Sequence, residues 1–446
     1  MALTLTVSAV EVASTPGQLS AALTGRDMSR LTITGEIDAR DFRFIADSLP
    51  NLVALDLSEA SIVAYTATQS PLTAQVYDYP AATLPHSILM GTQLEEIKLP
   101  KNLQALGNAS LAGCTALTTI EIPATVRLID DFAFSGSALT SIVLPDSLAT
   151  LGTGAFAHCY GLKTATIASG TIGDYAFLAD SALNAIIMGE RVTAIGAEAF
   201  HGTGLVEFDA TQAAALDSIA AWALAATPIT AAALPASVKH MGEGVFFGDS
   251  QLNQVALPAA VKQVRDLTFA GNSSLQLDSL LREGIDTIGA YAFYNVSAMR
   301  HMAIPASVTQ LGTQAMAGMT GLEQIDIAAS TPPSLGDSVW AGVDQPLVKL
   351  GTLNNEVASL YESAEQWNKF YILHDYLLYD VNGDGYVDVA DVNMVVAQVL
   401  GNKPEGINLL VADANGDGHI DVADVNIIVQ AVLNGGKTTV RRSKKK

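Results

Sequence analysis

A unit of 21 to 24 residues repeats along most of this chain of 446 residues. Each unit begins with an apolar residue that opens a segment such as LTSIVLP (139–145), and a second segment such as IGDYAF (172–177) follows in each unit. The eleven units begin at Leu94, Leu117, Leu139, Leu162, Leu183, Leu205, Ile229, Leu252, Leu275, Met299 and Leu322. A unit this short cannot bury a core alone, so the repeat predicts a solenoid of stacked coils.

The first segment of each unit predicts a β-strand. Positions 1, 4 and 6 are apolar and should face the core, because side chains alternate along a strand, and proline at position 7 ends it. In the second segment, the glycine that follows the opening apolar residue, as in IGDYAF, is expected to permit a tight turn. The phenylalanine of the same segment is expected to fill the core between coils. We therefore expect a parallel β-sheet on one face and irregular or short helical turns on the other.

The outward face of that sheet is a candidate binding surface. Positions 3 and 5 of the strands carry mostly small, neutral side chains, such as Thr164 and Thr166 or Ala231 and Ala233, and the last pair is Gln324 and Asp326. Binding hot spots are usually rich in Trp, Tyr or Arg, which this strip lacks. The strip thus fits either a solvated scaffold face or an interaction face whose ligand the sequence does not identify.

The ends of the repeat region should be closed by caps. We expect an N-terminal cap at residues 1–51, a solenoid at 52–346 with an insertion at about 64–86, and a C-terminal cap at 347–374. In the C-terminal cap, Tyr361, Trp367 and Phe370 are predicted to close the core.

The repeat pattern LxxIxLPxxxxxIGxxAFxxCxxL and the closing segment YESAEQWNKF (361–370) resemble the bacterial BspA-type leucine-rich-repeat family. That family is associated with bacterial cell surfaces and with adhesion to host or matrix proteins. The resemblance implies a surface protein of this kind, and we expect a non-catalytic protein whose sheet face binds a protein or a glycan.

Both cysteines, Cys114 and Cys159, lie three residues before a unit's first leucine, two units apart. Stacked strands lie about 4.8 Å apart, so the two sulfurs should be roughly 10 Å apart, too far for a disulfide. We expect both to be small buried residues.

Two acidic loops near the C-terminus have the spacing of calcium-binding EF-hand loops, with ligands at positions 1, 3, 5, 7, 9 and 12. Position 7 binds through its backbone carbonyl, and Gly385 and Gly418 stand at position 6, where the chain turns sharply. The predicted ligands of two structural Ca²⁺ ions are Asp380, Asn382, Asp384, Tyr386, Asp388 and Asp391 in the first loop, and Asp413, Asn415, Asp417, His419, Asp421 and Asp424 in the second.

Each loop leads into an apolar-faced helix, little room precedes the first loop for another helix, and position 12 is Asp. This duplicated arrangement resembles a type I dockerin at residues 375–436. The resemblance implies a cohesin-like partner and assigns positions 10 and 11 of each loop to partner contact. The matching residues are Val389, Ala390, Val422 and Ala423. They differ from the Ser-Thr-like pair of cellulosomal dockerins, so the type of cohesin stays open, but the two identical copies imply docking in either of two orientations.

The net charge of −22 includes a basic tail at 437–446, which contributes +6. The acidic remainder would repel the phosphate groups of a nucleic acid, so we expect no nucleic-acid binding. The first residues lack the positive start of an export signal, so we expect a clipped or mis-started signal. The uncharged stretch 218–238 continues the repeat and is interpreted as coil rather than as a transmembrane segment.

No catalytic pattern stands out, and the segment GTGAFA (152–157), which resembles a nucleotide-binding loop, is one unit's turn. The leading interpretation is therefore a non-catalytic, secreted or cell-surface adhesion protein. The alternatives are a non-catalytic part of a cohesin–dockerin complex in polysaccharide breakdown and, less favoured, an enzyme acting on glycosides.

Overall fold

The structure is a computed structural model that describes residues 9–66, 78–276, 280–353, 355–373, 379–384, 386–415 and 419–433. The chain divides into two compact units, Met1–Phe246 and Phe247–Lys446. In both units the repeats form the coils of a parallel β-solenoid, as the sequence predicted. No helix within the described residues has the length and hydropathy needed to cross a membrane.

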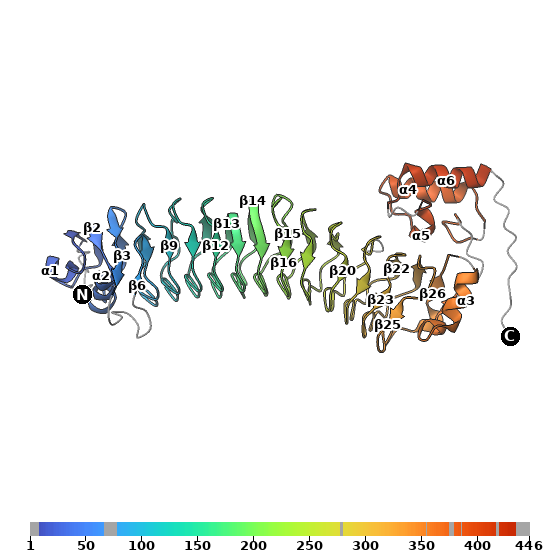
Figure 1. Cartoon of the computed structure of the whole chain (residues 1–446), viewed down its shortest axis with the longest axis horizontal. Coiled ribbons are helices and arrows are strands. Elements are labelled where there is room, and N and C mark those ends of the chain that lie inside the picture. Colours follow the sequence, from blue (N-terminus) through green and yellow to red (C-terminus); the bar gives the residue numbers. More distant parts are fainter. Residues whose placement is uncertain are drawn as a thin grey trace, which may run out of the picture. The chain divides into compact units, whose positions relative to one another are not determined.

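In the first unit, most coils contribute a strand on the face where the sheet was predicted, and most add a second, shorter strand to another parallel ladder (Figure 1). On that face, β1 (Ala9–Ser14), β2 (Arg30–Ile37), β3 (Ala54–Asp56) and β8 (Glu96–Lys98) form one parallel run of strands. A second run joins β11 (Ser141–Leu144), β13 (Thr164–Ile172) and β14 (Ala185–Ile195), and a third contains β15 (Glu207–Asp209) and β17 (Ala231–Ala233). The second ladder holds β4 (Ala60–Ile62), β7 (Thr83–Leu84), β9 (Ala105–Leu106), β10 (Leu128–Ile129), β12 (Thr150–Leu151), β16 (Ser218–Ile219) and β18 (His240–Met241), and the ends of β2, β13 and β14 also run into it.

The N-terminal end of the first unit departs from the repeat. Helix α1 (Leu19–Ala22) and helix α2 (Ala39–Ser48) precede the regular coils, and α2 begins with a capping box between Asp38 and Asp41. The predicted insertion contains the antiparallel pair β5 (Tyr65–Thr66) and β6 (Asp78–Tyr79).

The second unit repeats the two-ladder design. One set of strands is β19 (Gln254–Val255), β22 (His301–Ile304), β24 (Gln324–Ile327), β26 (Lys349–Gly351) and β27 (Tyr371–Ile372), and the other is β20 (Gln263–Val264), β21 (Thr287–Ile288), β23 (Gln310–Leu311) and β25 (Ser334–Leu335). The last coils are followed by η1 (Gln345–Leu347), α3 (Asn355–Ser363) and η2 (Trp367–Lys369), and the acidic loops by α4 (Val389–Val399), α5 (Leu409–Ala412) and α6 (Val422–Leu433).

The core of the coils is a stack of the repeated apolar residues. In β11, Ile142 and Leu144 are buried and Val143 is exposed, as the strand pattern predicted. The rings of Phe134 and Phe156 stack with centroids 5.1 Å apart, and Phe177 and Phe200 continue the stack at spacings of 5.4 and 5.3 Å. One aromatic ring per coil therefore fills the interior of this part of the solenoid.

The repeat glycines have a different role from the expected one. A Cβ added to Gly196 would lie 2.5 Å from the backbone nitrogen of Asp174 in the preceding coil, and one on Gly173 would lie 2.5 Å from the carbonyl oxygen of Leu151. Neither glycine has a φ angle in the left-handed region. The expected tight turn does follow the glycine, since the N–H of Ala199 donates to the carbonyl of Gly196 at 3.4 Å. The glycine itself, however, is needed because adjacent coils approach too closely for a side chain.

The left-handed conformation occurs two residues later in each repeat. Phe132, Tyr175 and Trp222 have φ angles of 56°, 59° and 59°. At the same place in other coils stand Gly154 and Gly244, and the rings of Phe132 and Trp222 lie directly over these glycines. The strain of each turn is thus carried at this position.

We call the turn that contains the repeated Ala-Phe pair, or its counterpart, the AF turn. Tyr175, Phe177 and Ala179 donate backbone hydrogen bonds to the carbonyls of Ala197, Ala199 and His201 in the next coil, each 2.8 Å long. Three alternate N–H groups of one AF turn thus pair with three alternate carbonyls of the next.

Two details of the predicted sheet differ in the structure. The segment 117–123 forms no strand, although Leu117 and Ile122 face the core as predicted. Asp326, predicted to face outward, is fully buried and lies 2.6 Å from the imidazole of His301 on the neighbouring strand. A buried carboxylate is tolerated when it is paired, and this cross-strand pairing is not visible in the repeat pattern.

The cysteines and the C-terminal cap follow the predictions. Cys114 and Cys159 are both buried and free. Burial raises the pKa of the Cys159 thiol to about 12, so it is an unreactive core residue at neutral pH. Trp367 packs edge-on against Tyr361, and both are buried with Phe370 at the end of the coils.

Candidate metal centre and docking surface

The two acidic loops end alike, each leading into a helix. Asp388, at position 9 of the first loop, is the N-cap of α4, and its side chain accepts a hydrogen bond from the N–H of Ala390. In the second loop, Asp421 accepts the same bond from Ala423, at the start of α6. Asp388 and Asp391 form a capping box, a helix-start signal that the Asp-x-x-Asp sequence already carries.

The carboxylates at position 12 fasten both ends of the loops. Asp391 accepts hydrogen bonds from the N–H groups of Val381 (2.7 Å) and Asn382 (3.0 Å) with one oxygen, and from that of Asp388 (2.8 Å) with the other. In the second loop Asp424 bonds the N–H groups of Asn415 and Asp421. Both carboxylates are completely buried.

The side chains at positions 1, 3 and 5 of the first loop turn toward one another. The N–H of Asp384 donates to the side-chain oxygens of Asp380 (3.1 Å) and Asn382 (2.8 Å), and the amide of Asn382 donates to Asp384 at 3.0 Å. Gly383 at position 4 turns the chain with a φ angle of 70°. This glycine was not among the predicted turn residues, and Gly385 and Gly418 lie outside the described residues.

The remaining predicted ligands take matching places. Tyr386 and His419, at position 7 of each loop, are exposed, as their predicted role of ligation through the backbone carbonyl allows. Asp413 and Asn415 begin the second loop, and Asp417 lies outside the described residues.

The donors suit calcium by their chemistry. All predicted ligands offer oxygen from carboxylates, amides or backbone carbonyls, the atoms that Ca²⁺ prefers. Residues 380–436 contain nine acidic residues against the single base Lys403, so a cation would relieve their repulsion. Within the described residues, no three His, Cys, Asp or Glu side chains meet closely enough to form a metal cluster by themselves. The fit thus rests on the donor set and on the loop closure by Asp391 and Asp424.

A small core holds the two loop–helix units together. Val395 of α4, Ile428 of α6 and Val381 of the first loop are fully buried, together with residues of the connecting segment. Helix α5, a single turn, precedes the second loop, and its N-cap Asn408 donates its N–H to the carbonyl of Val381 at 2.8 Å. The sequence pattern had indicated only the two helices that follow the loops.

The four predicted partner-binding residues are exposed. Val389 and Val422 are each 62% exposed at equivalent positions of α4 and α6, beside the exposed Ala390 and Ala423. At the other ends of the helices, Leu400 and Leu433 are 70% and 72% exposed. Exposed valine and leucine side chains in matching places on two helices are what a two-fold docking surface requires.

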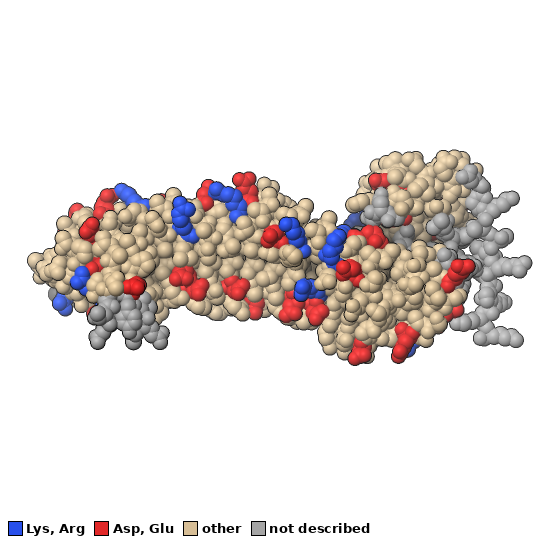
Figure 2. Space-filling model, in the orientation of Figure 1, with Lys and Arg blue, Asp and Glu red and all other residues tan. Residues whose placement is uncertain are grey.

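The solenoid surface has a different character. Figure 2 shows acidic and basic side chains as separate spots on a largely uncharged surface. On the outward face of the sheet, Val143, Thr166 and Ile187 are cross-strand neighbours, and Val143 and Ile187 are 67% and 64% exposed.

The solenoid fold is similar to that of solved leucine-rich-repeat structures. The structure of a leucine-rich repeat protein from Bacteroides ovatus matches with a TM-score of 0.50 and 18% identity over 82% of this chain and 92% of that chain. A leucine rich cell surface protein from Faecalibacterium prausnitzii matches with a TM-score of 0.30 and 20% identity over 67% and 79% of the two chains. No functionally curated protein sequence has a significant match.

The sequence profile of the BspA type leucine rich repeat region matches residues 82–206, 170–280 and 272–345, and that of the dockerin type I domain matches residues 378–433. The chain therefore belongs to the BspA-type leucine-rich-repeat proteins and carries a C-terminal type I dockerin domain.

Proposed function

We propose that this chain is a non-catalytic binding protein of the bacterial exterior that attaches to a cohesin through its calcium-loaded dockerin. The observation that carries the proposal is the duplicated loop–helix unit, with buried Asp391 and Asp424 closing the loops and Val389 and Val422 equally exposed. Two Ca²⁺ ions are the proposed structural cofactors, one per loop, held by the twelve predicted ligands. Calcium is more plentiful outside cells, which fits the proposed location.

Calorimetric titration of the whole chain with a purified type I cohesin tests this proposal. We expect a saturable complex in calcium, loss of binding in EDTA, and loss of binding in the double variant Asp391→Ala, Asp424→Ala. The matched control is Asp146→Ala, Asp217→Ala, which removes two exposed carboxylates of the solenoid. Binding that persists in EDTA, or no binding to any of several cohesins, would contradict the proposal.

We further propose that the solenoid presents its outward sheet face to a host or matrix protein or to a glycan. Val143 and Ile187, exposed on either side of the half-buried Thr166, support this choice of face, because exposed apolar side chains gathered on one face are typical of interaction surfaces. Binding to immobilised fibronectin and to an array of neutral glycans should weaken in Val143→Arg and Ile187→Arg. The control variant Thr211→Arg changes an exposed residue outside the strands.

The proposal includes the absence of catalysis. Incubation of the chain with a panel of plant and host polysaccharides should release no reducing sugar above the level of a heat-denatured sample. Release of sugar would favour the alternative of an enzyme, whereas capture by cohesin without any solenoid ligand would favour a structural part of a polysaccharide-degrading complex.

A further inference from the structure

The ladder of AF turns has an open end in the first unit. Ser87, Leu89 and Gly91 of the first AF turn donate hydrogen bonds to the carbonyls of Asn108, Ser110 and Ala112 in the next coil. In the first AF turn itself, the equivalent carbonyls lie 22 residues earlier and belong to His86, Ile88 and Met90. In the part of the chain that the structure describes, these three carbonyls accept no hydrogen bond from the protein.

The direction of these carbonyls follows from the peptide geometry. All described peptide bonds are trans, and in a trans peptide the C=O and the next N–H point in opposite directions. Because the N–H groups of Ser87, Leu89 and Gly91 point toward the next coil, the carbonyls of His86, Ile88 and Met90 point away from it. They form an unpaired row of acceptors, comparable to the edge of a β-sheet.

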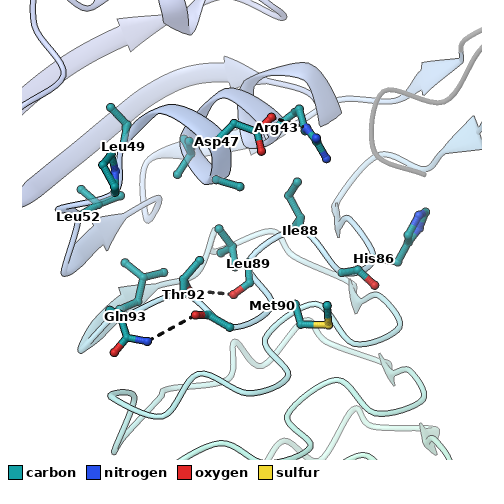
Figure 3. Close-up of a pocket in the computed structure, with 16 residues that line it drawn as sticks. Arg43, Asp47, Leu49, Leu52, His86, Ile88, Leu89, Met90, Thr92 and Gln93 are labelled. Carbon is teal, nitrogen blue, oxygen red and sulfur yellow. Dashed lines mark hydrogen bonds and ion pairs between the residues drawn. The ribbon is translucent and has the colours of Figure 1, made fainter. Parts of the chain in front are cut away.

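A hollow of about 410 Å³ lies on this side of the first AF turn, between the turn and helix α2. Figure 3 shows Arg43 and Asp47 of α2 on one side of it and Ile88, Leu89 and Met90 on the other. Its wall includes the apolar side chains of Leu49 and Leu52, while Met90 is 58% exposed. Arg43 and Asp47 form an ion pair of 2.6 Å with each other.

The opposite end of the chain's repeats is closed differently. In the C-terminal cap, Gln366 accepts a hydrogen bond from the N–H of Val339 in the last AF turn and donates one to the carbonyl of Gly336. There a cap side chain bonds the backbone of the last turn, whereas α2 supplies no such bond to the first one. Trp367 and Phe370 of the cap also pack edge-on against Trp340 of this turn, so a second copy of this chain could not stack there without displacing the cap.

We propose that the open end binds a polypeptide segment in the AF-turn conformation, supplied by a partner with the pattern Gly-x-x-Ala-Phe-x-Gly. Three alternate N–H groups of such a segment would pair with the carbonyls of His86, Ile88 and Met90, and its apolar side chain would enter the hollow. The same pairing joins every later pair of AF turns, and addition of a chain segment to a free edge is a recurrent mode of recognition. The site is separate from the dockerin, so it goes beyond the proposed function.

A synthetic peptide that copies residues 195–203 (IGAEAFHGT) is the probe, because Glu198, Phe200 and Gly202 are the three donors of that AF turn. Saturation-transfer NMR with the whole chain should show saturable binding. An analogue methylated at these three amide nitrogens should bind on the order of tenfold more weakly or worse, because it has lost the hydrogen bonds.

Two protein variants locate the site. Ala46→Trp places an indole at an exposed residue that lines the hollow, and it should abolish binding. The control Ala21→Trp places an indole at an exposed residue of α1 and should leave binding unchanged. Circular dichroism shows whether each variant is folded. No binding of the peptide at millimolar concentration, equal binding of the methylated analogue, or undiminished binding to a folded Ala46→Trp variant would each overturn the proposal.

Discussion

Gly196 and its counterparts show how single residues set the spacing of the coils. Their missing side chains allow the backbone of the preceding coil to pass within 2.5 Å of the site where a Cβ would stand. Because the obstacle is backbone rather than a flexible side chain, it cannot move aside without separating two coils.

We therefore expect Gly196→Ala to lower the free energy of unfolding by about 1–3 kcal/mol, the usual cost of overpacking. Gly25→Ala is the matched control, since nothing lies within 4 Å of an added Cβ there. Thermal or urea unfolding followed by circular dichroism measures both. Equal stability of the two variants would show that the coils separate easily at this position.

Asp180 is a second residue with a specific energetic effect. It is fully buried, one oxygen accepts the N–H of Cys159 at 2.7 Å, and the other has no hydrogen-bond partner. Burial raises the pKa of this carboxyl from 3.8 to about 9, so it is neutral in the folded chain at pH 7. In the unfolded chain the Asp180 carboxyl ionises near pH 4. The free energy of unfolding should therefore fall as pH rises from about 4 to about 9.

Asp180→Asn keeps an oxygen for the N–H of Cys159 and removes this ionisation. Its unfolding temperature should exceed that of the unaltered chain at pH 8, and the difference should shrink toward zero near pH 4. The control Asp146→Asn, at a side chain that is 81% exposed, should show no such trend. A lower unfolding temperature for Asp180→Asn at pH 8 would mean that the ionisation of this carboxyl does not limit stability.

At the scale of elements, the repeat pattern predicted the features that recur in every coil. The inward residues of strands such as β11 and the stack through Phe156 follow from apolar residues at fixed spacing. The second ladder was not predicted, because its strands, such as β12 (Thr150–Leu151), are mostly two residues long, too short to show the alternation of a strand. The burial of Asp326 depends on His301, on another coil, and no local pattern reports such a partner.

The two acidic loops that precede α4 and α6 were predictable for another reason. Calcium ligation restricts the side chain at positions 1, 3, 5, 9 and 12, and the sharp turn favours glycine at position 6, so the pattern is specific even in one sequence. Helix α5 escaped prediction because its four residues, Leu409–Ala412, are shorter than any periodic signal.

We expect these helices to depend on calcium. Without it, the nine acidic residues of the module repel one another, and only the small core around Val395 and Ile428 holds the module together. Addition of EDTA should reduce the helical circular-dichroism signal, while the β-rich signal of the coils remains. Re-addition of Ca²⁺ should restore it, and Mg²⁺ at the same concentration should restore less. A spectrum unchanged by EDTA would contradict a structural role for calcium.

At the scale of the whole molecule, the chain combines two kinds of surface. The solenoid offers a long, mostly neutral face, and the dockerin offers two small apolar patches at equivalent positions, one at Val389 and one at Val422. We propose that these patches attach the chain to a cohesin, with either patch sufficient because the two are alike.

The most direct test is the affinity of the whole chain for a type I cohesin, in calcium, when an aspartate replaces one or both valines. Val389→Asp and Val422→Asp should each stay within about threefold of the unaltered chain, because the other orientation remains available, and the double variant should bind about 100-fold more weakly or not at all. A double variant that retains its helical signal and binds as tightly as the unaltered chain would contradict the claim.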